Sequence, residues 1–326
     1  MTVRVATYFC VLWIVFCMAN SMTAHGSEVP LPNRAEIWID LYTGEPIEFH
    51  EMISDLAEAD LIFLGERHTV PRHHRWQRKI VDTLLAEGSA LVLGLEMMEA
   101  RYQHELDRYG RGELDFDELA QATEWSDRWS NYEDYREIIE SARKAGATIL
   151  ALNADSEVVR KIGRHGLEAL TEEERSLLPR HLDLNEGPYF DLLKMQMMVH
   201  AGVTEDNLHA IFAAQVARDD TMAATMADFL TSPAGKGRQA VILCGAGHCS
   251  YGYGTVSRLK SRLPKAEDRI VILSESGDVE LSAEMKKYMR EIQISHQQMR
   301  DVIRQPIGDY LSIIQPKLEP AKTADP

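Results

Sequence analysis

The chain has 326 residues, a formal net charge of −16, 45% hydrophobic residues and 26% charged residues. This length suffices for one large α/β domain or two small ones, and the composition is that of an ordinary globular protein. The acidic balance argues against nucleic acid as a partner, because nucleic-acid binding needs a basic surface. It also disfavours electrostatic adsorption to anionic lipid.

The first 26 residues are predicted to be a secretory signal peptide. Arg4 is the only charge before an apolar run over residues 5–19, and Ala24-His25-Gly26 offers a small-x-small cleavage site. The run is too short for a typical membrane span, and an uncleaved N-terminal anchor is the alternative. Cys17 follows a phenylalanine where a lipoprotein site needs a small residue, so we do not expect lipidation there.

Short apolar runs predict buried strands that alternate with helical stretches. This alternation predicts an α/β fold with a central, mostly parallel sheet flanked by helices. A helical insertion, residues 156–231, follows the third strand. The predicted strands are residues 61–64, 90–95, 148–152, 239–244 and 270–274.

We expect residues 27–276 to form the α/β domain. The character of the chain changes after Gly277, where residues 280–305 have the pattern of a charged amphipathic helix and prolines interrupt the remainder. Residues 277–326 are therefore expected to be a C-terminal helix and a disordered tail.

The stretch LIFLGERHTVPRHHRWQ at residues 61–77 joins a buried strand to a group of polar side chains. Gly65 ends the strand, and Pro71 fits the first turn of the next helix, where its missing N–H costs nothing. Glu66 and His68 lie between them. In open α/β sheets ligands bind at the carboxyl ends of the strands, so this loop is a candidate site. A surface loop before a histidine-rich helix start is the simpler alternative.

The residues just past the predicted strands are mostly ionisable, which is unusual for strand ends. Imidazoles and carboxylates gathered on one sheet edge suit three chemistries. They could hold a divalent metal through His68, Glu96 and His248, form a general base with its orienting carboxylate, or anchor a porphyrin. The full set is Glu66 with His68, Glu96, Asn153 with Asp155, His248, and Glu275.

Two further segments are expected to form the wall of a pocket at this edge. They are the aromatic segment 125–135 and the helix that carries Gln215 and Asp219, whose polar groups interrupt otherwise apolar faces. His73 and His74 are weaker candidates, because adjacent residues of a helix point in different directions.

Two of the four cysteines, Cys10 and Cys17, lie in the predicted signal peptide, which leaves Cys244 and Cys249. Export makes a disulfide chemically possible. Because Cys244 ends a buried strand and Cys249 lies beyond a Gly-Ala-Gly-His turn, we expect a buried, unpaired Cys244 rather than a bridge. The spacing matches no cysteine zinc framework.

Motifs in a fixed order extend over roughly residues 55–275. They are GERHTVPRHHRWQ at 65–77, Glu96 after the second strand, the Trp-and-Tyr segment that ends at Tyr135, Asn153 after the third strand, AAQVARDDTMA at 213–223 and GAGHCSYGYG at 245–254. Together they resemble the ChaN family of haem-binding uptake proteins, in the Tiki-like superfamily. An ordered set of this kind is far more specific than any single motif.

The resemblance implies an exported, iron-regulated protein that binds haem, with two haems face to face in a homodimer. It places the protein in the periplasm or at the outer membrane, with a membrane-associated haem transport system as a further partner. The pocket would be lined by Glu66, His68, Glu96, Asn153, Gln215 and His248. A tyrosine would ligate each iron, and a histidine would contact the haem carboxylates. The motifs do not locate that tyrosine, and the candidates are Tyr132, Tyr135, Tyr189 and Tyr251.

The same residues leave a hydrolase as the alternative. Related branches of the superfamily resemble erythromycin esterases and Tiki metalloproteases, whose working residues are a G-x-x-H and a separate glutamate. Gly65, His68, Glu96 and His248 match that pattern. An esterase or a metal-dependent peptidase would use His68 as a base or these side chains as metal ligands. A third reading is an interaction module that kept the scaffold and lost both chemistries.

Overall fold

The computed structural model describes residues 36–197, 203–274 and 305–314. The predicted signal peptide lies outside these residues, as do Glu275 and residues 280–304 of the predicted C-terminal helix. In the described part of the chain, no helix is long and apolar enough to cross a bilayer.

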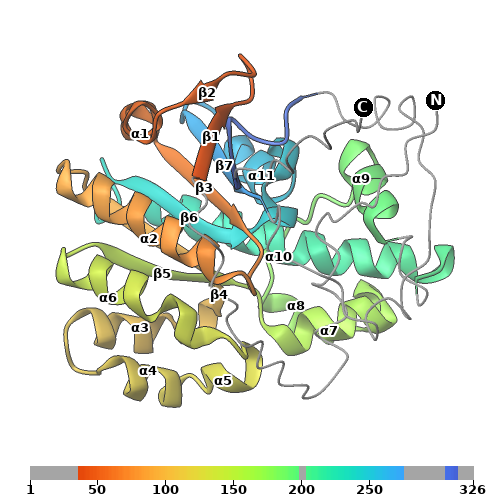
Figure 1. Ribbon diagram of the computed structural model, residues 1–326. Helices are drawn as coiled ribbons and strands as arrows, with labels where there is room; N and C mark the ends of the chain where they lie inside the picture. The colour runs from red at the N-terminus through yellow and green to blue at the C-terminus, as the bar shows by residue number, and fades with distance from the viewer. Residues whose placement is uncertain (1–35, 198–202, 275–304, 315–326) are drawn as a thin grey trace, which may run out of the picture.

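The described strands form one eight-stranded sheet in the order β2-β1-β8-β7-β3-β6-β4-β5 (Figure 1). Pairing is parallel from β8 through β7, β3, β6 and β4 to β5, and antiparallel where β1 meets β8 and β2. The predicted mostly parallel α/β sheet is confirmed, and the five predicted strands are β3 to β7. The strands are β1 Glu36–Asp40, β2 Pro46–Ile47, β3 Leu61–Glu66, β4 Leu91–Glu99, β5 Thr148–Asn153, β6 Gln239–Gly245, β7 Asp268–Leu273 and β8 Tyr310–Ile314.

Helices cover both faces of the sheet. The α-helices are α1 Phe49–Glu58, α2 Pro71–Ala86, α3 Gln103–Gly110, α4 Phe116–Ala122, α5 Trp125–Arg128, α6 Arg136–Lys144, α7 Ser156–His165, α8 Glu172–Ser176, α9 Pro188–Met197, α10 Glu205–Thr231 and α11 Gly254–Arg262. Short 3₁₀ turns connect several of them, among them η3 Tyr132–Tyr135, η5 Ala246–His248 and η6 Ser250–Gly252. Helices α7 to α10 form the predicted helical insertion between β5 and β6.

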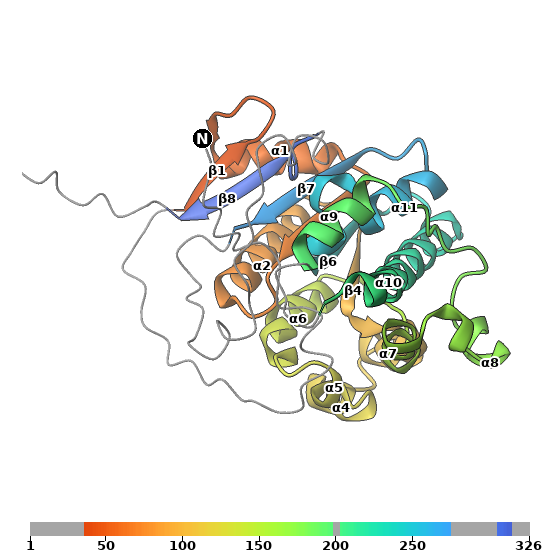
Figure 2. The same ribbon diagram turned by 90° about the vertical axis from the view of Figure 1, so that its right-hand side faces the viewer.

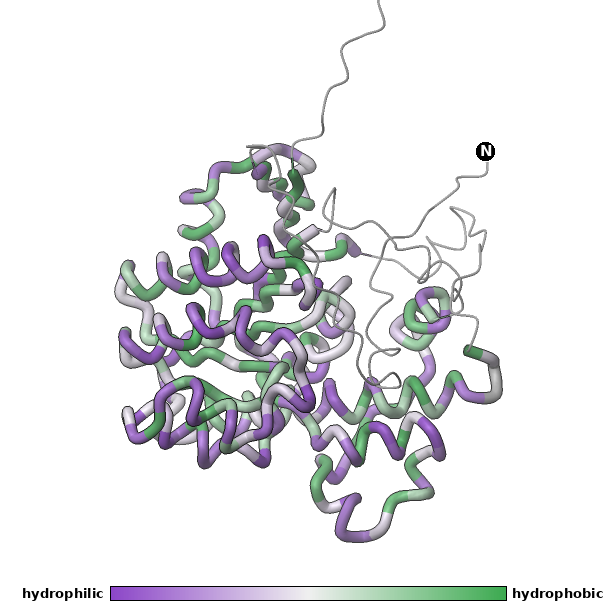
Figure 3. The backbone as a smooth tube through the Cα atoms, turned by 60° about the horizontal axis from the view of Figure 1, so that its bottom comes forward, coloured by the Kyte–Doolittle hydropathy of each residue, from purple (hydrophilic) through white to green (hydrophobic). Residues whose placement is uncertain are grey.

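Alternate residues of each central strand enter different apolar cores, because successive side chains of a strand point to opposite faces. In β3, Ile62 and Leu64 pack with α1, α2 and α6, whereas Phe63 packs with α10 and α11. Figure 2 shows these two helix groups on opposite sides of the sheet. Each helix therefore needs apolar residues on one side only, and the hydropathy along the helices of Figure 3 alternates accordingly.

Three methionines of the insertion, Met197, Met222 and Met226, belong to buried cores. Met222 and Met226, on α10, are fully buried against the sheet. A third core joins α7, α9 and the first half of α10. The core interpretation of the methionine stripe is thus confirmed for these three residues.

The C-terminal segment departs from the prediction. Residues 310–314, expected to lie in a disordered tail, form β8 and fill the gap between β1 and β7. The segment YLSII alternates buried and half-buried positions, as expected for a strand with one face more deeply buried than the other. The five residues of β8 are too short a pattern to predict a strand whose partners, β1 and β7, lie elsewhere in the sequence. The α/β domain therefore includes residues beyond 276.

Candidate functional site

The end of β3, the loop after it and the start of α2 bring a buried carboxylate together with two imidazoles. Glu66 Oε1 accepts hydrogen bonds from His68 Nδ1 at 2.8 Å and from the Tyr135 hydroxyl at 2.6 Å. His74 Nε2 lies 3.0 Å from Glu66 Oε2. Burial alone would raise the pKa of Glu66, but the His74 and His68 imidazoles outweigh it and hold that pKa well below its usual range.

A second buried carboxylate follows at β4. Glu96 Oε2 accepts a 2.6 Å hydrogen bond from the Gly245 N–H and lies 3.9 Å from His68 Nε2. His248 Nε2 lies 3.1 Å from Glu96 Oε1. Asn153, at the end of β5, donates to the Glu96 carbonyl at 2.8 Å. Glu96 is thus held by four groups that come from three other strand ends.

His248 lies between two carboxylates. Its Nδ1 is 2.6 Å from Asp219 Oδ1 and 3.1 Å from Gln215 Nε2, both on α10. Thr255 donates to the same Asp219 oxygen at 2.9 Å. Burial alone would lower the pKa of His248, but the Glu96 and Asp219 carboxylates raise it to about 10.

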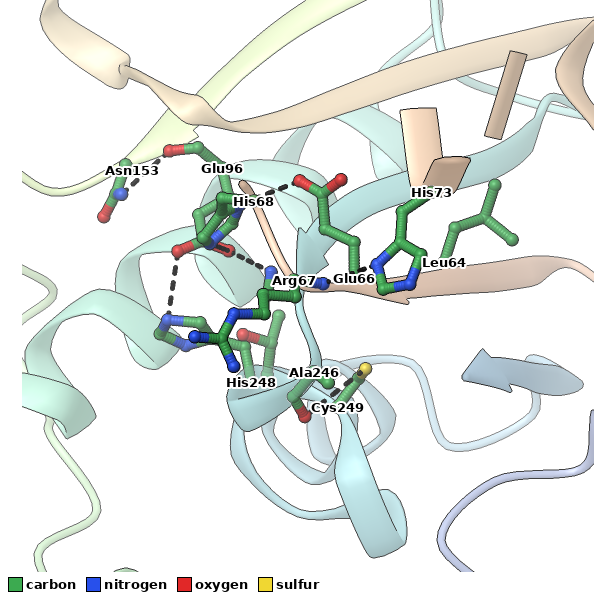
Figure 4. Close-up of polar contacts among 12 residues, drawn as sticks. Leu64, Glu66, Arg67, His68, His73, Glu96, Asn153, Ala246, His248 and Cys249 are labelled. Carbon is green, nitrogen blue, oxygen red and sulfur yellow. Dashed lines mark hydrogen bonds and ion pairs between the residues drawn. The ribbon is translucent and has the colours of Figure 1, made fainter. Parts of the chain in front are cut away.

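These contacts form one continuous acid–imidazole network. It runs, with alternating carboxylate and imidazole, through Asp219, His248, Glu96, His68, Glu66 and His74. Figure 4 shows its central part above the ends of the strands. The structure therefore brings together Glu66, His68, Glu96 and His248, with Asn153 and Gln215 beside them. Asp155 instead caps α7 and pairs with Arg101, and Glu275 lies outside the described residues. This convergence is the opposite of what an interaction module without a site would show.

Gly65 leaves room for this arrangement. A Cβ atom on Gly65 would lie 2.7 Å from Cys249 Sγ and 2.9 Å from the Ile272 side chain, far closer than normal contact. The glycine of the GERH motif therefore serves close packing of the turn after β6 against β3. Its φ is not in the left-handed region, so turn geometry is not the reason.

The two histidines at the start of α2 are more closely involved than the sequence indicates. His74 contacts Glu66, and His73 Nδ1 accepts a 2.9 Å hydrogen bond from the Arg67 N–H. Burial lowers the pKa of His73 to about 3. Both rings are buried because the first turn of α2 lies over the end of β3. The two side chains point in different directions there, yet each one contacts other parts of the protein. In the sequence, Pro71 marks the first residue of this helix and therefore places both histidines in its first turn.

The aromatic segment contributes one tryptophan to the site and one to the core. The ring of Trp129 meets His68 edge to face, with centroids 4.8 Å apart. Trp125 is buried, and its indole N–H donates to the Met97 carbonyl at 2.7 Å. Trp129 thus contacts the site, whereas plain packing accounts for Trp125.

The four candidate tyrosines have different surroundings. The Tyr135 hydroxyl donates to Glu66, and the Tyr189 hydroxyl donates to Asp219 Oδ2 at 2.7 Å. Burial, together with these carboxylates, raises the pKa of both phenols well above 10. Tyr132 stacks on Phe116 with centroids 6.1 Å apart.

Tyr251 follows the His248 turn with a φ of 60°. Left-handed backbone is uncommon outside glycine and is held only where the surroundings over-determine it. The C-terminal segment supplies that constraint here. The Ile307 carbonyl accepts from the Tyr251 N–H at 2.8 Å, and the Gln305 side chain donates to the Tyr251 carbonyl.

Among the described residues, no group of three or more His, Cys, Asp and Glu side chains is arranged to hold a metal ion. The His68 and His248 nitrogens that would bind a metal face carboxylates of the network instead. The predicted divalent metal on these residues and Glu96 therefore has no support from the geometry.

Comparisons with known proteins agree with this architecture. The family model described as "Haem-binding uptake, Tiki superfamily, ChaN" matches residues 52–259, which is more than half of the chain. A solved structure titled "Cofacial heme binding to ChaN of Campylobacter jejuni" has a TM-score of 0.62 and 20% identity, and it covers 87% of this chain and 98% of that chain. It shares the fold.

Two other matches are more distant. The solved structure of an erythromycin esterase mutant, EreC in its open conformation, has a TM-score of 0.44 and 13% identity, over 72% of this chain and 76% of that chain. The curated protein RETICULATA-RELATED 5, chloroplastic, from Arabidopsis thaliana is 24% identical over 238 residues, 67% of this chain and 31% of its own length. The chain thus spans about a third of that relative. On the family match, the chain belongs to the ChaN family of haem-binding uptake proteins in the Tiki superfamily.

Proposed function

We propose that this chain is an exported haem-binding protein of haem or iron uptake, with its haem pocket at the carboxyl ends of the strands. The observation that carries the proposal is the family match, since residues 52–259 include both loops of the acid–imidazole network. The ChaN structure whose title reports cofacial haem has the same fold. We propose the same cofacial arrangement for this chain, with two haems held between two copies of the protein.

The aromatic side chains beside Asp219 fit a porphyrin. Tyr189, Tyr251 and Tyr253 form a row, with ring centroids 6.0 Å apart between Tyr189 and Tyr253 and 6.4 Å apart between Tyr251 and Tyr253. All three side chains are half-buried. Neighbouring rings are tilted by 41° and 44°, so they offer separate aromatic contacts for a porphyrin and a phenol oxygen, which is a suitable ligand for ferric iron.

Among the candidate tyrosines we favour Tyr251 as the iron ligand. Tyr135 and Tyr189 donate their protons to buried carboxylates, so neither readily supplies a phenolate. Tyr132 is stacked on Phe116, in the aromatic segment away from α10 and α11. Tyr251 adjoins the His248 turn, and its left-handed backbone suggests a conformation kept for a role.

A hemin titration of the purified protein tests the proposal. We expect a Soret shift at micromolar hemin for the natural chain. We expect at least tenfold weaker binding, with loss of the tyrosinate spectrum, for Tyr251→Phe, because one iron–oxygen bond is removed. The matched control is Tyr42→Phe, since Tyr42 is 71% exposed. No Soret shift for the natural chain would contradict haem binding, and a loss confined to Tyr132→Phe would move the ligand there.

One observation favours a hydrolase as the second candidate. His68 Nδ1 bonded to Glu66 has the geometry of an imidazole base with its orienting carboxylate. In that case the natural chain would hydrolyse a member of an ester or peptide panel, and His68→Ala would abolish this activity. Turnover that needs an added divalent metal would restore the metal-dependent reading. A panel without any turnover by the natural chain would leave this candidate without support.

Export and self-association are further parts of the proposal. The predicted signal peptide supports export to the periplasm or outer membrane, and the N-terminal sequence of the mature protein in a cell fraction tests it. Cofacial haems require two copies, so hemin is expected to shift the sedimentation of the protein from monomer to dimer. Sedimentation unchanged by hemin would contradict haem-bridged dimers. A membrane-associated haem transport system is the proposed recipient.

A further inference from the structure

Two thiols lie beneath the site and take no part in haem binding as proposed. Cys244 is in β6, and Cys249 follows η5; both are free and fully buried. This agrees with the expectation of an unpaired Cys244. In Figure 4 Cys249 lies beside Ala246 in the His248 turn, where its sulfur is 3.8 Å from the Ala246 carbonyl.

The two thiols are neighbours across Gly65. Cys244 and Gly65 are partners in the parallel ladder of β6 and β3, so their Cα–Cβ directions point to the same face of the sheet. A Cβ on Gly65 would be 2.7 Å from Cys249 Sγ, so this sulfur occupies the space that the glycine leaves beside Cys244. The hydrogen bond with Cys249, followed by burial, raises the pKa of the Cys244 thiol.

We propose that Cys244 and Cys249 form a disulfide by exchange with an external small-molecule disulfide, such as oxidised glutathione. One cysteine thiolate attacks the external S–S bond, forms a mixed disulfide and releases one reduced thiol. The second thiolate then attacks the mixed disulfide and releases the other. Two protons leave the protein, the cysteines are oxidised and the external disulfide is reduced. The predicted export would place the chain in an oxidising compartment, where disulfides form and persist.

Burial determines when the exchange occurs. A thiol without solvent contact and with a raised pKa is a poor nucleophile, so the closed native state is expected to react slowly. During folding, or on local opening of the turn after β6, both sulfurs become accessible. The bridge is therefore expected to form in oxidative refolding and to persist once the turn has closed.

The bridge would act on the haem site through the turn that it spans. Cys244 precedes Gly245, whose N–H holds Glu96, and Cys249 follows His248. A disulfide requires the two sulfurs to come to about 2.05 Å, closer than two thiols in contact. The turn must shift to allow this, and it is then fixed. This consequence for haem rests on the proposed function.

Peptide mapping tests the bridge itself. Trypsin cleavage after Arg238 and Arg258 releases both cysteines in one peptide, residues 239–258. After refolding of the full chain with oxidised and reduced glutathione, we expect this peptide to lack two hydrogens and to take up no alkylating reagent until it is reduced. Alkylation of both cysteines without reduction would overturn the proposal, and so would a link between two such peptides from different copies. Cys249→Ser is the matched control, which can form a mixed disulfide only.

Two readouts on the natural chain, oxidised or reduced, test the coupling. Hydrogen exchange of residues 245–254 without haem is expected to be slower in the oxidised form. Hemin affinity is expected to differ between the two forms by about fivefold or more, the low end of typical coupling between sites. A bridge that changes neither readout overturns the coupling. If neither form binds hemin but exchange differs, the proposed function fails and the coupled disulfide stands.

Discussion

The two edges of the parallel sheet use their polar residues in opposite ways. At the carboxyl edge, ionisable side chains contact one another in the buried acid–imidazole network. At the amino edge, a hollow of about 800 Å³ is lined by the starts of β3 and β6 and the loops around them. There the Gln239 side chain donates to the carbonyls of Leu56, Ala57 and Ala59 at 2.9, 3.3 and 2.6 Å.

The comparison shows that a hollow in the surface and a cluster of reactive side chains lie at different edges of the sheet. Gln239 satisfies backbone carbonyls where α1 ends, which is a requirement of the fold. The network instead buries carboxylates and imidazoles that could be replaced by apolar side chains if only stability mattered. A hollow alone would direct attention to the amino edge. The charges and the family motifs direct it to the carboxyl edge, where parallel α/β sheets bind ligands.

Removing one carboxylate from the network is expected to produce the largest effect. Glu96→Ala leaves the His248 and His68 imidazoles without their shared partner in a buried site, and it should cost about 3–5 kcal/mol of unfolding free energy. Gln239→Ala is the matched change at the amino edge. It should cost about 1–3 kcal/mol of unfolding free energy, because it leaves only uncharged backbone carbonyls without their hydrogen-bond donor. Urea denaturation measures both. Equal losses would contradict the distinction between the edges.

The next effect depends on pH and belongs to His248. Its pKa is about 10 in the folded protein against an ordinary 6.5, so the charged imidazole stabilises the fold. This contribution is fully present below pH 6.5 and is lost as the pH rises through about 10. The difference in unfolding free energy between the natural chain and His248→Gln should therefore be largest below pH 6.5, by up to about 1.4 kcal/mol for each unit of the pKa difference, and should shrink towards pH 10.

An exposed histidine provides the control for that slope. His209 has a 66% exposed side chain 2.9 Å from Glu186. His209→Gln should give a small, nearly flat difference, because water screens an exposed pair. A flat difference for His248→Gln as well would mean that the buried carboxylates do not hold the proton.

The sequence predicts the sheet well because the central strands are buried on both faces. Runs such as residues 61–64 and 239–244 are apolar without interruption, which is typical of parallel strands between two helix layers. The same reasoning predicts that Glu66, Glu96 and His248 converge. Each follows its strand within a few residues, and parallel strands end at one edge.

Other parts were beyond such reasoning because they depend on partners distant in the sequence. β8 is held by β1 and β7, and nothing in YLSII identifies them. Similarly, the sequence places Asp219 in the expected wall of the site, but only the fold shows that its carboxylate pairs with His248. The roles of His73 and His74 depend on where the first turn of α2 lies over β3, which the helical pattern does not specify.

Packing at Gly65 predicts a smaller loss. Gly65→Ala would put a methyl group 2.7 Å from Cys249 Sγ and 2.9 Å from Ile272, so we expect a cost of about 1–3 kcal/mol in denaturation. The double variant Gly65→Ala/Cys249→Ala should recover part of it, because the sulfur is removed. Gly247→Ala is the control, since no atom lies within 4 Å of its added Cβ. Equal costs for the two glycines would show that the close packing is relieved elsewhere.

The smallest effect concerns the link between the C-terminal strand and the site. Ser312, on β8, is fully buried, donates to Glu36 and accepts from Arg72 Nη1 at 3.2 Å. Arg72 directly precedes His73 and also contacts Glu36 and the Ser274 carbonyl, so it keeps partners when the hydroxyl is lost. Ser312→Ala should therefore cost about 1 kcal/mol, the worth of one hydrogen bond.

A double-mutant cycle with Glu36→Gln distinguishes this hydrogen bond from a local packing change at Ser312. If the three groups form one unit, the two substitutions should be non-additive by about 0.5 kcal/mol or more in unfolding free energy. Strict additivity would show that the hydroxyl acts alone. In that case β8 would be attached to β1 and β7 by its ladder hydrogen bonds and by packing, without help from the start of α2.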